Sequence, residues 1–575
     1  MMRKSVNLFF FLNLFLIHAS AQEFLGDTSY KASPDFAPCK YIFFNPYFEG
    51  VNDQVYQVDT LLHQFQRYDA TLRSENIYAT LGQTGQAHTP MNFNKVYTPF
   101  FSYKTVPYPE YYKTLSKIKL YEGKNPYSRL YWATGLGKEN IFEALHAQNI
   151  KDFYLGFNLD AATNTGRYTR QSTNRINFDV QLGYHLPNHL WGVFATYILN
   201  HFQIPSSSLK SHQYYMLNYV DFSGVSKNKR KTGVFTHSFD CNGWTDKYQD
   251  SILDLSKYYT ITNQLQYSNY RFNEQLPEKD FIFRYAFGFS HQYTHIYYFK
   301  DDYQTFRPSF NLFLKLRKYT MGADGSYSIH GYNHKNYHLQ MKLGLRLDTL
   351  SKHKIGLTAG AFSRAPDYMM NYYSGNYSLW QNQLKNEQVY TTAFNYQFQK
   401  YGLEFRYFLV KNHSYLDVQS QPAQIENAFS LIQAHLLVPF RVKGFCVDLN
   451  AYTQYTPETC VNIPYFAMQS SIYYGFKVFK KKLELQIGFN IDYNTPYYAQ
   501  SYNSNLRQFY RQTDYKLGNY MYSDVFLNFK ILRLNAFIMC TQYLGGIMGS
   551  HYITTPYYPM EGTSVKFGVA WRFYD

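Results

Sequence analysis

Charged side chains recur at every second position along many segments of this 575-residue chain, with apolar side chains between them. In the segment 173–185, for example, Ile176 and Phe178 alternate with Arg175 and Asp179. Successive side chains of an extended strand point to opposite faces of its sheet. Charges placed in this way would line a pore and set its preference for anions or cations. The charged residues that we assign to the polar, pore-lining face are Arg175, Asp179, Arg284, Lys342, Arg346, Glu484, Lys566 and Arg572.

The overall charge adds a hypothesis about the solutes of such a pore. The chain holds 56 Lys and Arg against 40 Asp and Glu, a formal net charge of +16. A basic pore would pass anions more readily than cations. The alternative is that basic segments such as 227–231 lie in loops and pair with the phosphates of lipopolysaccharide. We expect no nucleic-acid partner, because no matching fold motif accompanies the basic run.

Residues that could support catalysis or metal binding lack a functional spacing. The stretch His237–Trp244 contains His and Cys but no regular ligand pattern, so a loop is the favoured interpretation. The sequence shows no GxSxG or other nucleophile motif. We therefore expect no enzymatic activity, no cofactor and no metal. Of the five cysteines, Cys446 and Cys460 could pair in an oxidising compartment.

The N-terminus has the layout of a secretory signal. Arg3 and Lys4 precede an apolar run from Leu8 to Ile17, and small residues follow at 19–21. The run is shorter than the ~20 residues that a membrane-spanning helix needs, and we find no longer one downstream. We predict a signal peptide over residues 1–21. Only helices and closed barrels cross a bilayer, so the exported chain is either secreted or a β-barrel.

Composition and connection lengths favour the barrel over a secreted β-sandwich. Aromatic residues make up 20% of the chain, which suits many strands with one apolar face. Short predicted turns, such as Leu350–Lys354, alternate with long polar segments, as in barrels with short periplasmic turns and long outer loops. The long segments include Asn200–Tyr258 and Tyr293–Arg307, and one of the short turns is Arg317–Gly325.

These patterns predict an all-β protein, a transmembrane antiparallel β-barrel over residues 127–575. Counting hairpins back from the last strand gives about 18 strands beginning near Phe153, within a range of roughly 16–20. A further pair is indicated within 127–149. Alternation is weaker over residues 22–126, which we interpret as a periplasmic extension, a segment associated with the lumen, or early irregular strands.

Four segments occur in a fixed order between about Gln54 and Asp575. They are VDTLLHQFQRYD, LGQTGQAHTPMNF, FEALHAQNI with FYLGFNLDAATNTGRYTRQSTNRINFDVQLGYH, and YYPMEGTSVKFGVAWRFYD. In this order they resemble the "putative porin" family of Bacteroidetes. The resemblance implies an outer-membrane barrel and a passive pore. The last strand, with Trp571 and Phe573 as late aromatic residues, also looks like the signal read by the barrel-assembly machinery.

The function expected on these grounds is a porin-like channel for small hydrophilic solutes in the cell outer membrane, with anion preference as a hypothesis. Its expected partners are outer-membrane lipid, lipopolysaccharide and the assembly machinery, and a homo-oligomer stays open. One alternative is a non-conducting barrel for adhesion or assembly. The other is a TonB-dependent-type receptor. Such a receptor needs an N-terminal plug and 22 strands, and the ~105 mature residues before the predicted barrel hardly suffice for both.

Overall fold

The computed structural model describes residues 40–43, 56–58 and 61–574, with gaps at 96, 98–99, 124, 136–138, 169–170, 187–190, 205–206, 222–230, 249–251, 271–279, 349–351, 481 and 546–551. The predicted signal peptide lies outside the described residues. No helix among the described residues is long and apolar enough to cross a membrane.

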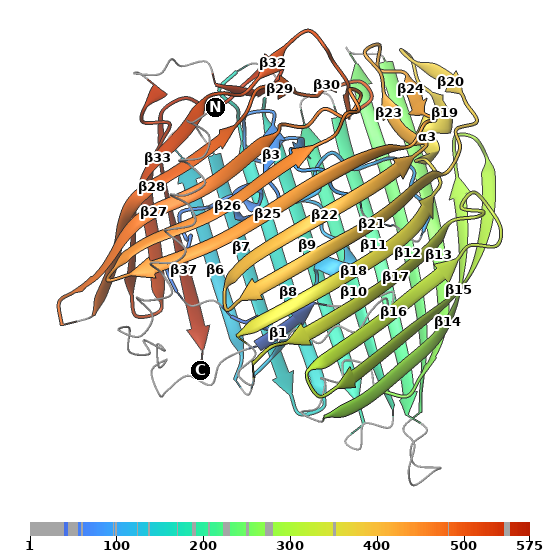
Figure 1. Cartoon of the computed structure of the whole chain (residues 1–575), viewed down its shortest axis with the longest axis horizontal. Helices are drawn as coiled ribbons and strands as arrows, with labels where there is room; N and C mark the ends of the chain where they lie inside the picture. The colour runs from blue at the N-terminus through green and yellow to red at the C-terminus, as the bar shows by residue number, and fades with distance from the viewer. Residues whose placement is uncertain are drawn as a thin grey trace, which may run out of the picture.

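Twenty-two antiparallel strands close into a single barrel (Figure 1). In chain order these strands are β6 (Tyr127–Gly135), β7 (Glu139–Ile150), β8 (Phe153–Asn164), β9 (Thr173–His185), β10 (Trp191–Ile204), β11 (Ser207–Asp221), β12 (Thr232–Tyr248), β13 (Ile252–Ser268), β14 (Phe281–Ile296), β15 (Asp301–Leu316), β16 (Tyr319–Tyr327), β17 (Tyr337–Arg346), β18 (His353–Arg364), β21 (Glu387–Phe398), β22 (Tyr401–Lys411), β25 (Phe429–Val442), β26 (Phe445–Tyr455), β27 (Phe466–Val478), β28 (Leu483–Asn494), β33 (Met521–Ile531), β34 (Leu534–Thr541) and β37 (Ser564–Tyr574). The first and last of them pair, from Lys566 opposite Gly135 to Tyr574 opposite Tyr127, and this pairing closes the ring.

The predicted strand number was too low, for two reasons. The segment Asn200–Tyr258, expected to be a loop, contains the whole of β11 and β12. The additional pair indicated within 127–149 exists as β6 and β7. Two predicted connections were also too long: β14 and β15 continue through Tyr293–Arg307 to a turn at 297–300, and β16 begins at Tyr319, inside the predicted turn Arg317–Gly325.

The connections at the two ends of the barrel differ. The end where β37 finishes, marked C in Figure 1, carries tight turns such as 399–400 and 443–444. The other end carries longer connections with structure of their own. Their elements are α3 (Tyr368–Asn371), β19 (Tyr372–Ser374), β20 (Leu379–Gln381), β23 (His413–Leu416), β24 (Pro422–Ile425), β29 (Tyr497–Tyr498), β30 (Ser501–Asn503), β31 (Gln508–Tyr510), β32 (Lys516–Leu517), β35 (Ile553–Thr555) and β36 (Tyr558–Pro559). We call these the turn end and the loop end.

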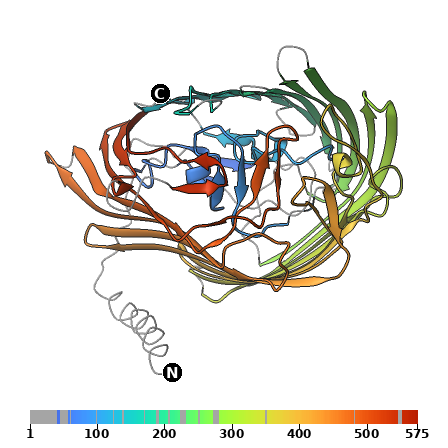
Figure 2. The same cartoon turned by 90° about the horizontal axis from the view of Figure 1, so that it is seen from above.

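The described elements before β6 lie inside the ring of strands, where Figure 2 shows them in blue. We call its described residues from 61 to 122 the lumen segment. Its elements, together with the short strands that precede it, are β1 (Lys40–Phe43), β2 (Tyr56–Gln57), α2 (Ala70–Arg73), β3 (Tyr78–Thr80), β4 (His88–Pro90), η2 (Leu115–Lys117) and β5 (Lys119–Glu122). A barrel of this strand number encloses a lumen wide enough to hold such a segment.

The two faces of the wall carry opposite chemistry. On β17 the side chains of Leu339, Met341 and Leu343 point outward and are exposed. On β9 the side chains of Asn177 and Asp179 point inward and are buried. An apolar outer face suits hydrocarbon, and a polar inner face suits water or polar protein groups. Cys446 and Cys460, which the sequence allowed to pair, are both free thiols, because β26 separates them.

We predict that Met341→Arg destabilises the folded barrel in a bilayer by about 2–4 kcal/mol, because it places a charge in hydrocarbon. The neighbouring change Lys342→Arg, on the inner face of the same strand, should cost less than about 0.5 kcal/mol. Urea unfolding of both variants in lipid vesicles measures the difference. Equal effects would contradict the assignment of the two faces.

Candidate functional site

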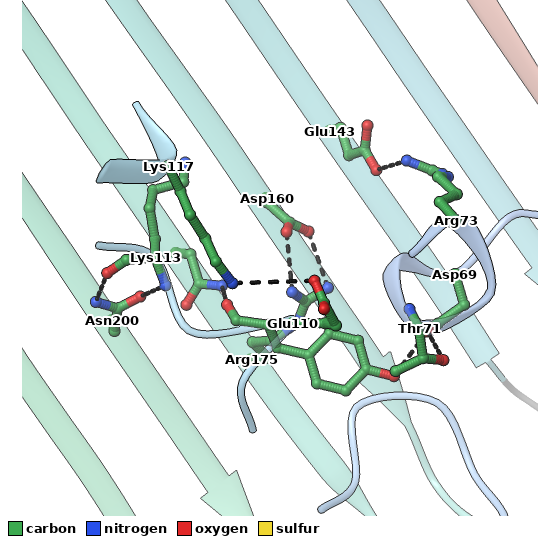
Figure 3. Close-up of polar contacts among 12 residues, drawn as sticks. Asp69, Thr71, Arg73, Glu110, Lys113, Lys117, Glu143, Asp160, Arg175 and Asn200 are labelled. Carbon is green, nitrogen blue, oxygen red and sulfur yellow. Dashed lines mark hydrogen bonds and ion pairs between the residues drawn. The ribbon is translucent and has the colours of Figure 1, made fainter. Parts of the chain in front are cut away.

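The lumen segment is bound to the inner wall by side chains of β9 and β10 (Figure 3). Lys113 forms an ion pair with the buried carboxylate of Asp179. The amide of Asn200 accepts a hydrogen bond from the Lys113 backbone nitrogen at 2.8 Å and donates one to the Lys113 oxygen at 2.9 Å. Asn177 donates to the Tyr111 carbonyl oxygen at 2.6 Å. Amide side chains of the wall thus fix the segment's backbone at Tyr111 and Lys113.

Arginine–carboxylate pairs connect neighbouring wall strands with each other and with the lumen segment in the same region. Arg175 donates two hydrogen bonds to Asp160, each 2.9 Å long, and its guanidinium lies 4.6 Å from the centre of the Tyr111 ring. On the neighbouring strand, Glu143 pairs with Arg73 of the lumen segment at 3.0 Å. Bidentate pairs of this kind fix orientation as well as charge (Figure 3).

Amide side chains bind the segment to the opposite wall. Gln66 donates to Asn490 at 2.9 Å and accepts from Asn528 at 2.8 Å. Further along, Gln454 of β26 accepts from the Phe93 backbone nitrogen at 2.9 Å and donates to the Met91 oxygen at 2.7 Å. Because each buried amide both donates and accepts, the wall satisfies backbone groups that the segment leaves outside regular secondary structure.

The connection between β34 and β37 packs on the segment from the loop end. Thr554 accepts from the Thr80 backbone nitrogen and donates to the Thr80 oxygen, at 3.0 and 2.9 Å. Gly82 has φ +93°, and a Cβ atom there would lie 2.2 Å from the Pro559 oxygen. Only glycine fits this contact. The segment is therefore bound on its wall side and on its loop side.

One part of the inner wall is not covered. Tyr97 of the segment stacks on His338 of β17 with ring centres 4.8 Å apart, which identifies the inward face of that strand. Lys342 and Arg346 follow on the same face toward the turn end. Lys342 is exposed and Arg346 is half-buried, and Lys354 on β18 is exposed as well. This wall faces open lumen.

The eight residues predicted to line a pore all lie on the inward face of their strands. Only Lys342 is exposed there, while Arg346 and Glu484 are half-buried. The other five, Arg175, Asp179, Arg284, Lys566 and Arg572, are buried. Lys566 contacts both Glu139 and Glu561. Trp571 and Phe573 lie on the outward face, with exposed fractions of 53% and 37%.

The sequence analysis missed the uncharged residues that hold the lumen segment, among them Gln66, Asn200, Gln454 and Asn528. Asn200 is the first residue of the predicted loop Asn200–Tyr258. The alternation that identified Arg175 would also have identified the wall amides. It was applied only to charged residues, and it applies equally to Asn and Gln. No pattern in the sequence indicates their partners, which lie far away along the chain.

Most of the basic run 227–231 falls outside the described residues. The strands that flank it, β11 and β12, meet at the turn end. In the part of the chain that the structure describes, no three His, Cys, Asp or Glu side chains gather closely enough to hold a metal ion.

His88 is a titratable group in the centre of the lumen segment. Its ring is 1% exposed, and its Nε2 accepts a hydrogen bond from the Glu110 backbone nitrogen at 3.1 Å. Burial lowers the pKa of His88 to about 4. The ring is therefore neutral at pH 7, as its role of acceptor requires.

We predict that acidification from about pH 6.5 to about 4 loosens the lumen segment. In this window an unfolded segment takes up a proton on His88 and the folded one does not, so stability falls as pH falls, by up to about 3 kcal/mol. Protease cleavage within residues 61–122, measured across this range on the folded barrel, reports the loosening. His88→Gln should flatten the pH dependence, and an unchanged profile in that variant would contradict the assignment.

Comparison with known proteins adds a family and a set of similar folds. The family model described as "Putative porin" matches residues 47–207 and 206–575. No curated protein matches the chain.

Solved structures with a similar fold are outer-membrane receptors and transporters for iron compounds. The siderophore receptor PirA from Acinetobacter baumannii is 9% identical, with a TM-score of 0.55 over 78% of this chain and 80% of that chain. The FrpB iron transporter from Neisseria meningitidis is 12% identical, with a TM-score of 0.53 over 78% and 82%. The hemophore receptor HasR from Serratia marcescens is 12% identical, with a TM-score of 0.54 over 79% and 81%. At these identities the likeness concerns the fold alone. The family match spans nearly the whole chain, and the protein belongs to the family described as "Putative porin".

Proposed function

We propose that this protein is an outer-membrane channel through which small hydrophilic solutes diffuse passively, with a preference for anions. The passage runs beside the lumen segment, along the inner face of β16, β17, β18, β21 and β22. We propose no enzymatic role. Membrane lipid surrounds the barrel, and the outward aromatic residues of β37 serve its insertion by the assembly machinery.

The observation that carries the proposal is the uncovered wall. On these strands the inward side chains near the turn end, including Lys342, Lys354 and Gln397, are exposed. The inward residues of β9 from Thr173 to Gln181, in contrast, are buried beneath the segment. Polar side chains exposed on the inside of a barrel require water beside them. A water-filled path therefore lies next to the segment at this end.

The charge of the uncovered wall supports the anion preference. Lys342, Arg346 and Lys354 lie on the neighbouring strands β17 and β18, where Lys342 is opposite Thr358 and Arg346 is opposite Lys354. Lys315 lies on β15, two strands from β17. Among the described residues none of these four forms an ion pair. The nearest inward carboxylate on β22, Glu404, pairs with Arg406 on the same strand. Unneutralised bases in a narrow aqueous path attract anions and repel cations.

A second candidate is receptor-type uptake, in which the lumen segment must move before a ligand passes. Two observations favour it: the barrel has 22 strands, and a folded segment occupies its lumen. Barrels of this size often carry a plug. The two functions differ in one physical property, which is whether the segment stays in place during transport.

We predict that replacing Lys342 and Lys354 with Glu shifts selectivity toward cations. The double change replaces two positive charges with two negative ones on the uncovered wall. Reversal potentials in planar bilayers under a salt gradient should change toward the cation equilibrium potential. Lys482→Glu, which alters an exposed lysine in the turn between β27 and β28, provides the control. Cation selectivity in the unmodified protein would remove the anion preference.

A tether separates the two candidate functions. Gln66 and Asn528, whose side chains are hydrogen-bonded, can be replaced by cysteines in a background without the native thiols and joined by a short thiol-reactive cross-linker with a reducible spacer. We expect the cross-link to leave single-channel conductance unchanged, because the path runs beside the segment. Conductance or uptake that is abolished by the cross-link and restored by reductant would favour the moving plug instead.

A further inference from the structure

A cavity of about 110 Å³ lies where three parts of the chain meet. The lumen segment forms one side, strands β27, β28, β33 and β34 form the second, and the connection between β34 and β37 forms the third. The space is large enough for several water molecules or for one small solute. It lies toward the loop end, whereas the uncovered wall of the proposed passage lies toward the turn end.

The cavity is lined by carboxylates and by no base. Asp69, Asp492, Asp524 and Glu561 all contribute to its surface, and no Lys, Arg or His is among its described lining residues. Lys566 lies behind Glu561, where it pairs with Glu561 and Glu139. The positive charge of Lys566 is therefore taken up by Glu139 and Glu561. It does not balance the negative charges of Asp69, Asp492 and Asp524.

Besides Arg175, which is already paired with Asp160, Arg67 is the other base in this region. Its guanidinium donates to the Leu72 oxygen and to Ser471, at 3.2 and 3.3 Å. It provides one positive charge against three aspartates. The cavity surface therefore keeps an excess of negative charge, which burial makes costly without a cationic partner.

Three residues that line the cavity carry buried polar atoms without a hydrogen-bond partner among the described residues. Asp69 is 3% exposed, and its Oδ1 accepts from the Thr71 nitrogen, the Thr71 hydroxyl and the Tyr111 hydroxyl. Its Oδ2 has no partner among the described residues, and the same holds for Asp492 Oδ1. Gln83, which is 8% exposed, has an Nε2 donor without a partner. Each such group costs free energy unless a bound molecule satisfies it.

Several tyrosine rings also line the cavity. Tyr68, Tyr78 and Tyr111 come from the segment. Tyr522 comes from β33, and Tyr552 comes from the connection between β34 and β37, which we call the outer connection. The rings of Tyr522 and Tyr552 lie 5.3 Å apart. Ring faces beside carboxylates attract organic cations, whose charge is spread over apolar groups. The chain already uses this interaction at the border of the cavity, where Lys566 Nζ lies 4.7 Å from the centre of the Tyr68 ring.

We infer that the cavity is a binding site for a small organic cation that carries an ammonium group and a hydroxyl oxygen. The ammonium group would lie among the tyrosine rings and face the unpartnered aspartate oxygens, and the oxygen would accept from Gln83 Nε2. A multivalent metal fits less well, since no three carboxylate or imidazole groups of the described residues gather closely enough to ligate one. Because the segment, the wall and the outer connection each contribute a carboxylate, the bound cation would also hold the three together.

The test uses the full-length protein in detergent or nanodiscs and does not depend on conduction, so it stands apart from the proposed channel. Choline is the probe, and the comparison is its uncharged analogue with carbon in place of the nitrogen. Titration calorimetry should give millimolar or tighter affinity for choline, and about tenfold or more weaker binding of the analogue. No heat of binding for choline, or equal binding of the two, would overturn the proposal.

Variants locate the site. Asp492→Asn and Asp524→Asn keep the shape of the side chain and remove its charge, and each should weaken choline binding by about tenfold or more. Asp514→Asn changes an exposed carboxylate on the loop 495–520 and should leave the affinity unchanged. Heat-modifiable migration on gels verifies that each variant is a folded barrel. If folded variants at 492 and 524 bind choline as the unmodified protein does, the cavity is not the site.

Discussion

The structure depends on the pairing of β37 with β6. In hydrocarbon no water is available to the backbone, so every strand needs a partner on both sides. The terminal strands supply it to each other, from Lys566 opposite Gly135 to Tyr574 opposite Tyr127. This closure removes both sheet edges, and the other strands are then fixed by short turns at one end. The apolar outer face follows from the same requirement, because the closed ring is surrounded by lipid.

Closure of so many strands leaves an interior too wide to be filled by the wall's own side chains. The lumen segment fills part of it, and it is held both by polar contacts and by apolar clusters, in which Ile118, Tyr108 and Phe93 pack on apolar inward residues of the wall. Between these clusters Asn200, Gln66 and Gln454 each satisfy two hydrogen bonds at once. Where apolar contacts do occur, as at Leu217 of β11, the inward residue is fully buried.

The mixture of polar and apolar residues on the inner face explains which strands could be predicted from the sequence. On β9 and β17 the inward residues are polar and the outward ones apolar, so alternation predicted both strands and the direction of Arg175 and Lys342. On β11 the relation is partly reversed. Leu209 and Leu217 face the segment, while Lys210 and His212 lie on the other face. The sequence of such a strand resembles a polar loop. The predicted number of barrel strands was therefore too low. The contacts of the segment could not be predicted, because amides give no signal of the distant backbone groups they bind.

The position of the segment also divides the lumen into two environments. Against β9, β10, β28 and β33 it buries polar groups, and along β16 to β22 it leaves bases exposed to water. A barrel that needs no central core can make this division freely, because its stability resides in the hydrogen-bonded wall. Charges that would be costly in a packed core persist on both sides: carboxylates around the enclosed cavity at the loop end, and lysines on the uncovered wall at the turn end. The separation places negative and positive potential at different depths of one lumen. In the proposed channel a solute that passes along β16 to β22 would meet the bases of the uncovered wall, whereas the carboxylates of the cavity lie on the other side of the segment.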